Sequence, residues 1–185
     1  MEYTLILLVV ITGLLLLYVA YSYNKLVRLS NLLKEGWSGV EVHLKKRYDL
    51  IPNLVEVVKS YKNYEKDLLE KVTRQRSLLE RGSGPSSLAG EEEQISQSLK
   101  SILALAENYP DLKANQQFRD LQRALISVEN DLEKARRYYN GTVRNLNIYI
   151  QSLPSCFVAR FFGFPEGKFF EISSPVERSN PQTNF

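Results

Sequence analysis

The chain has 185 residues, a length typical of one domain, and a formal net charge of +3 from 24 Lys and Arg against 21 Asp and Glu. Apolar residues make up 44% of it and charged residues 24%, which excludes a collagenous or broadly disordered chain. One cysteine, Cys156, excludes an internal disulfide framework, and one histidine, His43, argues against a histidine-rich metal site. We therefore expect neither a bound metal nor another cofactor.

The first segment, residues 3–24, contains no charged residue and is mostly aliphatic. At about 1.5 Å per residue, a helix of this length reaches about 33 Å, which is enough for a hydrocarbon core of about 30 Å. A signal peptide cleaved after Ser22 is the alternative. However, the apolar run is longer than a normal signal-peptide core, and Glu2 makes the preceding residues acidic instead of basic. We expect residues 1–24 to be retained as a transmembrane anchor that contacts membrane lipid through residues 3–24.

Positive charge gathers on one side of this anchor. Glu2 is the one charged side chain before it, whereas Lys25, Arg28 and Lys34 follow it closely. The positive-inside rule places the basic side in the cytoplasm. We therefore expect a single-pass protein with a very short N-terminus outside and the remainder of the chain in the cytoplasm.

Residues 33–79 carry apolar side chains at alternating intervals of four and three residues, which is typical of an amphipathic helix facing partner helices. Pro52 lies inside this run and cannot donate a hydrogen bond to the carbonyl of Tyr48. Either the helix bends and continues, or Asp49 caps a new helix with Pro52 in its first turn. The unbroken apolar phase favours the bent helix.

Two further helices are predicted. Gly, Pro and Ser cluster at residues 81–87 and mark a break, after which residues 88–106 keep one apolar phase. Pro110 marks a second break, and residues 111–152 then form one long amphipathic helix. No segment alternates with a period of two, so we predict an all-α fold. It consists of the anchor, an antiparallel, up-and-down bundle of three to four long helices over residues 25–172, and a flexible polar tail at 173–185.

A short aromatic segment ends the bundle. Six of the eight phenylalanines lie between Phe157 and Phe170. If this segment is helical, Phe157, Phe161 and Phe164 share one face. The segment either folds back over the end of the bundle or enters the membrane surface, where its basic residues meet anionic headgroups. The candidate membrane or packing residues are Phe157, Arg160, Phe161, Phe162 and Phe164.

Polar residues around Pro52 form the candidate interaction site. Arg47 occupies an apolar seam position, and a buried arginine needs partners because an unpaired buried charge is costly. Two interpretations remain open. The residues form a polar notch that recognises a partner or an anionic group, or they satisfy the carbonyl and the charges that a helix bent by proline leaves without partners. Trp37 lies on the same seam, where a core or interface role is expected. The candidate residues are Trp37, Lys45, Arg47, Asp49, Pro52 and Asn53.

Several stretches resemble the LemA family. The densest is Arg47 to Val55, which reads RYDLIPNLV, preceded by Gly36-Trp37-Ser38 and followed by Glu107 to Asn115 and by Phe162-Gly163-Phe164. The resemblance covers roughly residues 1 to 172. It implies a bacterial membrane-anchored protein with one N-terminal helix and an α-helical bundle, and it implies no reaction. We expect the membrane to be the inner membrane of the cell. Some relatives are associated with membrane proteases, and others look like membrane-organising proteins.

The sequence contains no Gly-rich phosphate loop, nucleophile elbow or metal-ligand cluster, so we do not expect an enzyme. We expect a membrane-anchored interaction or scaffold protein whose bundle binds a membrane protein or other copies of itself. An adaptor for a membrane protease and a membrane-remodelling protein are the alternatives. Nucleic acid is not expected as a partner, because the net charge is modest and no nucleic-acid motif occurs. A small-molecule substrate is not expected either, since catalytic motifs are missing.

Overall fold

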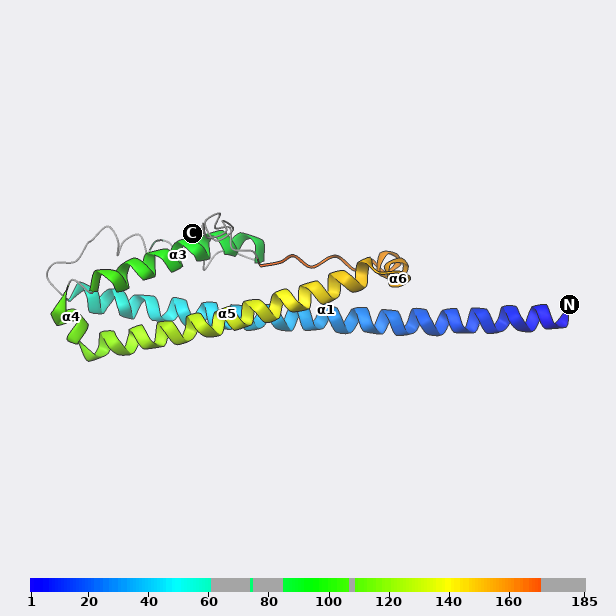
Figure 1. Ribbon diagram of the computed structural model, residues 1–185, viewed down its shortest axis with the longest axis horizontal. Coiled ribbons are helices and arrows are strands. Elements are labelled where there is room, and N and C mark those ends of the chain that lie inside the picture. The colour runs from blue at the N-terminus through cyan, green and yellow to red at the C-terminus, as the bar shows by residue number, and fades with distance from the viewer. Residues whose placement is uncertain (61–73, 75–84, 107–108, 171–185) are drawn as a thin grey trace, which may run out of the picture.

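A computed structural model of the chain describes residues 1–60, 74, 85–106 and 109–170, and these ranges hold helices and no strand (Figure 1). The helices are α1 (Glu2–Lys59), α3 (Pro85–Leu105), α4 (Pro110–Ala114), α5 (Gln116–Gln151) and α6 (Ser155–Phe161). The predicted all-α class is confirmed. Except for Arg74, the part of the predicted first helix that follows residue 60 lies outside the described residues, as does the predicted tail at 173–185.

Helix α1 joins the apolar segment to the bundle without a break. It has 58 residues, so it is about 87 Å long at about 1.5 Å per residue. It is long and apolar enough near its N-terminus to cross a membrane. The side chains of residues 2–17 are exposed, and the first buried one belongs to Ser22. The helix continues through Pro52, so the alternative of a separate helix capped by Asp49 is wrong.

Helix α5 returns antiparallel to α1, and α3 runs beside them in the direction of α1 (Figure 1). The two long helices approach closely at Gly36, where a Cβ atom would lie 3.3 Å from the Cα of Tyr139 and 3.3 Å from Oγ1 of Thr142. The core between α1, α3 and α5 is mostly apolar. Its buried residues include Leu44, Ile51, Leu54, Ile95, Ile102, Leu125 and Leu132.

The single helix predicted for residues 111–152 is wrong at one point, because Asn115 divides it into α4 and α5. Asn115 has extended backbone angles, φ −64° and ψ 126°. Its side-chain oxygen accepts a hydrogen bond from the backbone N–H of Phe118 at 2.9 Å. This N-cap satisfies one of the N–H groups that the start of a helix leaves without a partner. Helix α4 begins with Pro110 in its first turn, as predicted.

Residues 162–170, which we call the C-terminal strap, run back along the bundle from α6 (Figure 1). Two side-chain amides of α5 hold the strap by pairing with its backbone. Asn147 pairs with the N–H and C=O of Gly167 at 2.8 and 2.9 Å, and Asn140 pairs with those of Phe170 at 2.9 and 3.0 Å. Seven helical residues and three extended residues both advance about 10 Å, so both pairs form together. The backbone comes close at Gly167, where a Cβ atom would lie 2.6 Å from Cδ1 of Leu33.

Candidate functional site

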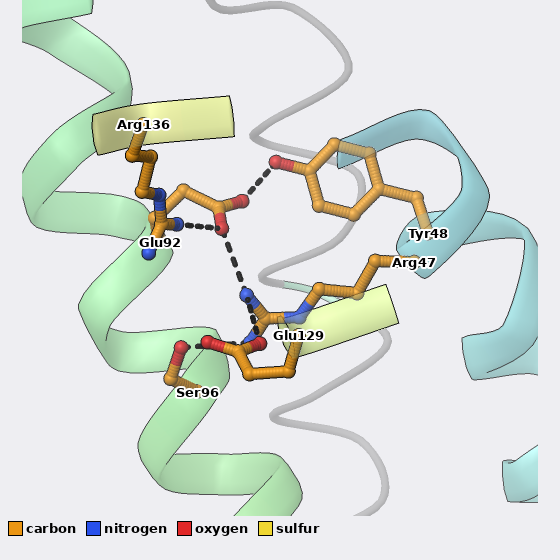
Figure 2. A network of polar contacts seen from close by, with 6 residues as sticks. All are labelled: Arg47, Tyr48, Glu92, Ser96, Glu129 and Arg136. Carbon is orange, nitrogen blue, oxygen red and sulfur yellow. Dashed lines mark hydrogen bonds and ion pairs between the residues drawn. The ribbon is translucent and has the colours of Figure 1, made fainter. Parts of the chain in front are cut away.

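Six polar side chains from three helices meet inside the bundle (Figure 2). We call this group the buried polar network. It comprises Arg47 and Tyr48 of α1, Glu92 and Ser96 of α3, and Glu129 and Arg136 of α5. The network therefore links the helices that form the core.

The carboxylate of Glu92 is the centre of this network. Its Oε2 atom lies 2.9 Å from Nη1 of Arg47 and 3.1 Å from Nη2 of Arg136, and its Oε1 atom accepts a hydrogen bond from the hydroxyl of Tyr48. The side chains of Arg47 and Glu92 are 2% and 1% exposed. Such charges are tolerated in an interior only when they are paired and hydrogen-bonded. One residue of α3 thus binds both α1 and α5.

Arg47 has two further partners. Its Nη1 atom lies 3.3 Å from Oε2 of Glu129, and its Nη2 atom donates a hydrogen bond to the hydroxyl of Ser96 at 2.8 Å. The two arginines balance the two glutamates in charge. The partners that the sequence required for a buried Arg47 are therefore supplied by α3 and α5, across the core.

Burial is the largest influence on the ionisation of this network. It raises the pKa of the Glu92 carboxyl, and the nearby Arg47 opposes that rise. Burial, followed by the charge of Glu92, raises the pKa of the Tyr48 hydroxyl far above its usual range, so this hydroxyl remains a donor. Burial also lowers the pKa of the Arg136 guanidinium. The arrangement is suited to holding three helices in register, because each charge faces an opposite charge.

A second distinctive region lies where α6 meets α1. Val158 and Ala159 are buried there against Leu26 and Leu146. A neighbouring side of α6, which lines a groove with residues 15, 18 and 19 of α1, is apolar and exposed. Two large side chains four residues apart, Phe157 and Phe161, form what we call the exposed aromatic row and are 66% and 83% exposed. Leu153, just before α6, is 76% exposed.

Gly163 ends α6 and turns the chain. It has a positive φ of 70°, and its N–H donates to the carbonyl of Arg160 at 3.3 Å, while the N–H of Phe164 donates to the carbonyl of Ala159 at 3.0 Å. This is the Schellman arrangement, in which glycine adopts the left-handed conformation at low cost. Phe164 therefore lies beyond the helix, with its ring centroid 5.8 Å from that of Tyr23. The expected shared face of three phenylalanines is wrong, since it holds for Phe157 and Phe161 alone.

The strap carries the remaining aromatic residues back to the bundle. Phe170 is 4% exposed, and its ring lies 6.3 Å from that of Trp37 and 4.8 Å from the guanidinium carbon of Arg136. The sequence left open whether the segment packs over the end of the bundle or enters the membrane surface. The packing applies to one part of the segment, and entry into the membrane by the other part stays a prediction. Phe164 and Phe170 pack, whereas Phe157 and Phe161 face outward.

A family model described as the LemA family matches residues 36–185 of this chain. The chain belongs to the LemA family. The match includes the buried polar network, α6 and the strap, and it begins at Gly36, where α1 and α5 pack closely.

Curated relatives of this LemA-family chain are distant in sequence. Protein LemA of Metamycoplasma hominis is 25% identical over 162 residues, covering 87% of this chain and 74% of that protein. Magnetosome protein MamQ 2 of Paramagnetospirillum magneticum is 21% identical over 175 residues, covering 80% of this chain and 64% of the relative. Magnetosome protein MamQ of Magnetospirillum gryphiswaldense is 21% identical over 174 residues with the same coverage. The chain thus spans less than two thirds of the length of the magnetosome relatives.

The LemA-family structure separates the predicted interaction residues. Arg47 enters the buried polar network. Four other candidates on α1 are exposed: Lys45, Asp49, Pro52 and Asn53. Trp37 packs against Tyr139, with ring centroids 5.4 Å apart, and its Nε1 donates a hydrogen bond to Glu41 at 2.6 Å. Of the remaining candidates in the aromatic segment, Arg160 is exposed. The ring centroid of Phe162 lies 4.8 Å from that of Tyr23.

Sequence reasoning missed the partners of Arg47. Glu92 belongs to a run of three glutamates early in α3, where the helix dipole by itself favours acidic residues. A signal was present, because Glu92 lies three residues before Ile95 and therefore on the apolar stripe that continues to Leu99 and Ile102. An acidic residue on the apolar face of α3 and a basic residue on the apolar face of α1 are complementary.

Proposed function

We propose that this LemA-family protein is a membrane-anchored helical scaffold, which acts by binding protein partners or other copies of itself and not by catalysis. The observation that carries this proposal is the continuity of α1. One helix, Glu2–Lys59, contains both the apolar segment and the first helix of the bundle. Because no loop separates the two, a partner bound to the bundle is held at a fixed distance from the membrane.

The exposed polar face of α1 is the surface we propose for this binding. Lys45, Asp49 and Asn53 follow one another at intervals of four residues, and all three are exposed. Val42, nearby on the same helix, is 50% exposed and adds apolar area. Lys45 lies about 30 Å along the helix from Lys25 at about 1.5 Å per residue, well clear of the anchor. Charges of both signs on one helix face favour a partner helix of complementary charge.

Photo-crosslinking in intact membranes tests this surface. A photoreactive residue replaces Asp49 in one variant and Lys134 in a control, since Lys134 is 76% exposed but lies on α5. We expect crosslinked products from position 49 that the control does not give. Products containing two copies of this chain indicate self-assembly, and a stoichiometric membrane protease indicates the adaptor alternative. Equal products from both positions, or none, contradict the proposal.

We further propose that the anchor crosses a bacterial inner membrane once, with the bundle in the cytoplasm. The basic residues Lys25, Arg28 and Lys34 directly after the apolar segment support this orientation. A reporter fused after Phe185, active in one compartment only, tests it. Activity on the cytoplasmic side is expected, and activity confined to the other side overturns the orientation.

Membrane remodelling is a second candidate, favoured by the exposed aromatic row beside the apolar segment. An amphipathic element that occupies one leaflet adds area to that leaflet alone and favours curvature. Electron microscopy of vesicles carrying the full-length protein tests this function. We expect curved or tubular vesicles with the native chain and round ones with a Phe157→Ser, Phe161→Ser variant. Round vesicles in both cases exclude it.

A further inference from the structure

A groove of about 420 Å³ lies between α6 and the apolar part of α1. Its walls come from both helices and are apolar apart from one tyrosine hydroxyl. They include Leu15, Tyr18 and Val19 of α1 and Phe157, Phe161 and Phe162 at α6. The exposed aromatic row therefore continues into a groove whose other wall belongs to the segment we propose as the anchor.

The position of the groove along α1 places it within the bilayer. Lys25, the first charged residue after the apolar segment, marks the level of the headgroups, and its ammonium lies 4.6 Å from the ring centroid of Tyr149. Val19 and Leu15 precede it by about 9 and 15 Å at about 1.5 Å per residue. One leaflet contributes about 15 Å of hydrocarbon. The groove thus coincides with the acyl chains of the leaflet on the bundle side.

The orientation of α6 fits this depth. Figure 1 shows α6 almost end-on, so its axis crosses that of α1. The side facing Leu15 and Val19 is aromatic, whereas Cys156 and Arg160 line a different surface together with Glu166. A helix that crosses the anchor at this level and has one apolar and one polar side is oriented like an amphipathic helix that lies in the plane of the membrane.

We propose that the groove between α6 and α1 holds an acyl chain of a phospholipid in the leaflet on the bundle side. Helix α6 then lies in the membrane plane as a second point of attachment. Lipid is the occupant that the position indicates, since any surface at this depth along the anchor is surrounded by acyl chains. The inference rests on the anchoring role proposed above for residues 1–24.

Fluorescence quenching in vesicles tests the depth of α6. The full-length chain is reconstituted into phosphatidylglycerol vesicles containing phosphatidylcholine with brominated acyl chains. A tryptophan replaces Phe161 in one variant, Phe157 in a second, Leu14 on the exposed anchor in a third, and Phe169 on the strap in a fourth. The native Trp37 lies about 18 Å along α1 beyond Lys25 and supplies the unquenched background. Helical circular dichroism confirms that each variant folds.

We expect Phe161→Trp and Phe157→Trp to be quenched as strongly as Leu14→Trp, and Phe169→Trp to remain unquenched. Quenching of Leu14→Trp without quenching at Phe161 or Phe157 overturns the groove proposal and leaves the anchor in place. Absence of quenching at Leu14 overturns the anchor itself. The two failures are therefore distinguishable.

Crosslinking identifies the occupant. A benzophenone side chain at position 161, activated in the same vesicles, is expected to add the mass of one phospholipid to the chain, and the same group at position 169 is not. A product with the mass of two chains means that a second copy fills the groove, and this overturns the proposal. An unmodified chain at both positions also overturns it.

Discussion

Two regions of the bundle distribute polarity in opposite ways. Far from the apolar segment, Arg47 and Glu92 bury their charges almost completely. Beside the apolar segment, Phe157 and Phe161 are 66% and 83% exposed. Burying such a phenylalanine side chain stabilises a protein in water by about 1.5–3 kcal/mol, so leaving two of them exposed forfeits stability there. The network thus withdraws its charges from solvent, whereas α6 leaves two phenylalanines open to it.

The two regions also differ in what they require from their neighbours. The buried polar network needs particular partners at hydrogen-bond distance, because an unpaired charge in the core is costly. The aromatic row needs only an apolar medium. Substitutions in the network should therefore alter stability in any medium, whereas substitutions in the row should act only where lipid is present.

Replacing Glu92 is expected to have the largest effect. Glu92→Gln leaves Arg47 with one carboxylate and Arg136 with none in the network, and it should lower the free energy of unfolding by about 3–5 kcal/mol. Glu129→Gln is the matched control. Its side chain is 46% exposed, so a loss of about 1 kcal/mol or less is expected. Chemical denaturation of the detergent-solubilised chain measures both. Equal losses would show that Glu92 is not the centre of the network.

Replacing all three buried charges sharpens this test. Breaking a buried ion pair is costly, but exchanging the whole group for apolar residues is often neutral. An Arg47→Met, Glu92→Leu, Arg136→Met variant should therefore regain most of the stability that Glu92→Gln loses. If it also keeps the crosslink from position 49, the network is structural. A folded variant without that crosslink would instead make the network part of the recognition surface.

Releasing the strap should have an intermediate effect. Asn147→Ala removes both hydrogen bonds to Gly167 and should lower the free energy of unfolding by about 1–3 kcal/mol. Gln151→Ala is the control, since its bond to Glu166 is exposed. Trp37, the single tryptophan, is the probe because it contacts Phe170 at the end of the strap. A red-shifted Trp37 emission is expected for Asn147→Ala alone. An unchanged spectrum would mean that the strap stays bound without Asn147.

Substitutions in the exposed aromatic row should hardly change the free energy of unfolding when lipid is absent. Phe161→Ser changes a side chain that is 83% exposed. In a fragment lacking residues 1–24, studied without detergent or lipid, it should change the free energy of unfolding by about 0.5 kcal/mol or less. Val158→Ser on the buried side of α6 is the control and should be clearly destabilising. The same Phe161→Ser change should weaken retention of that fragment on phosphatidylglycerol vesicles. A large loss of stability without lipid would show that Phe161 packs on the protein.

Much of the fold was predictable because it depends on local periodicity. The apolar stripe of α1 carries through Pro52, and the helix follows it. The division at Asn115 was not predicted, since the apolar phase from Ala114 to Phe118 crosses the break without a slip. A cap is a local hydrogen bond, so periodicity alone does not reveal it.

The candidate site was predictable only in part because its partners are distant in sequence. The position of Arg47 on the apolar seam indicates that it is buried and paired. It does not say that the partner is Glu92, 45 residues away. The strap shows the same limit: Asn140 and Asn147 are two helical turns apart, but the backbone that they bind comes from beyond α6. Sequence patterns show which face of a helix a residue occupies, but only the fold shows which distant residue it contacts.

Titration of Tyr48 gives the most specific prediction. Burial and the charge of Glu92 raise the pKa of its hydroxyl in the folded chain, against the opposing effect of Arg47. In the unfolded chain this hydroxyl ionises near its usual value of 10.0. Above that pH the folded state binds one more proton than the unfolded state, so stability falls as the pH rises.

Tyr48→Phe removes this titration while keeping the ring. The free energy of unfolding of the native chain should therefore decline above pH 10 more steeply than that of the variant, by roughly 1 kcal/mol per pH unit. Denaturation at several values between pH 9 and about pH 11 measures the difference, in which the other tyrosines cancel. Parallel curves would mean that the hydroxyl ionises equally in both states. Such a result would place Tyr48 in contact with water and remove the contrast between a buried polar network and an exposed aromatic row.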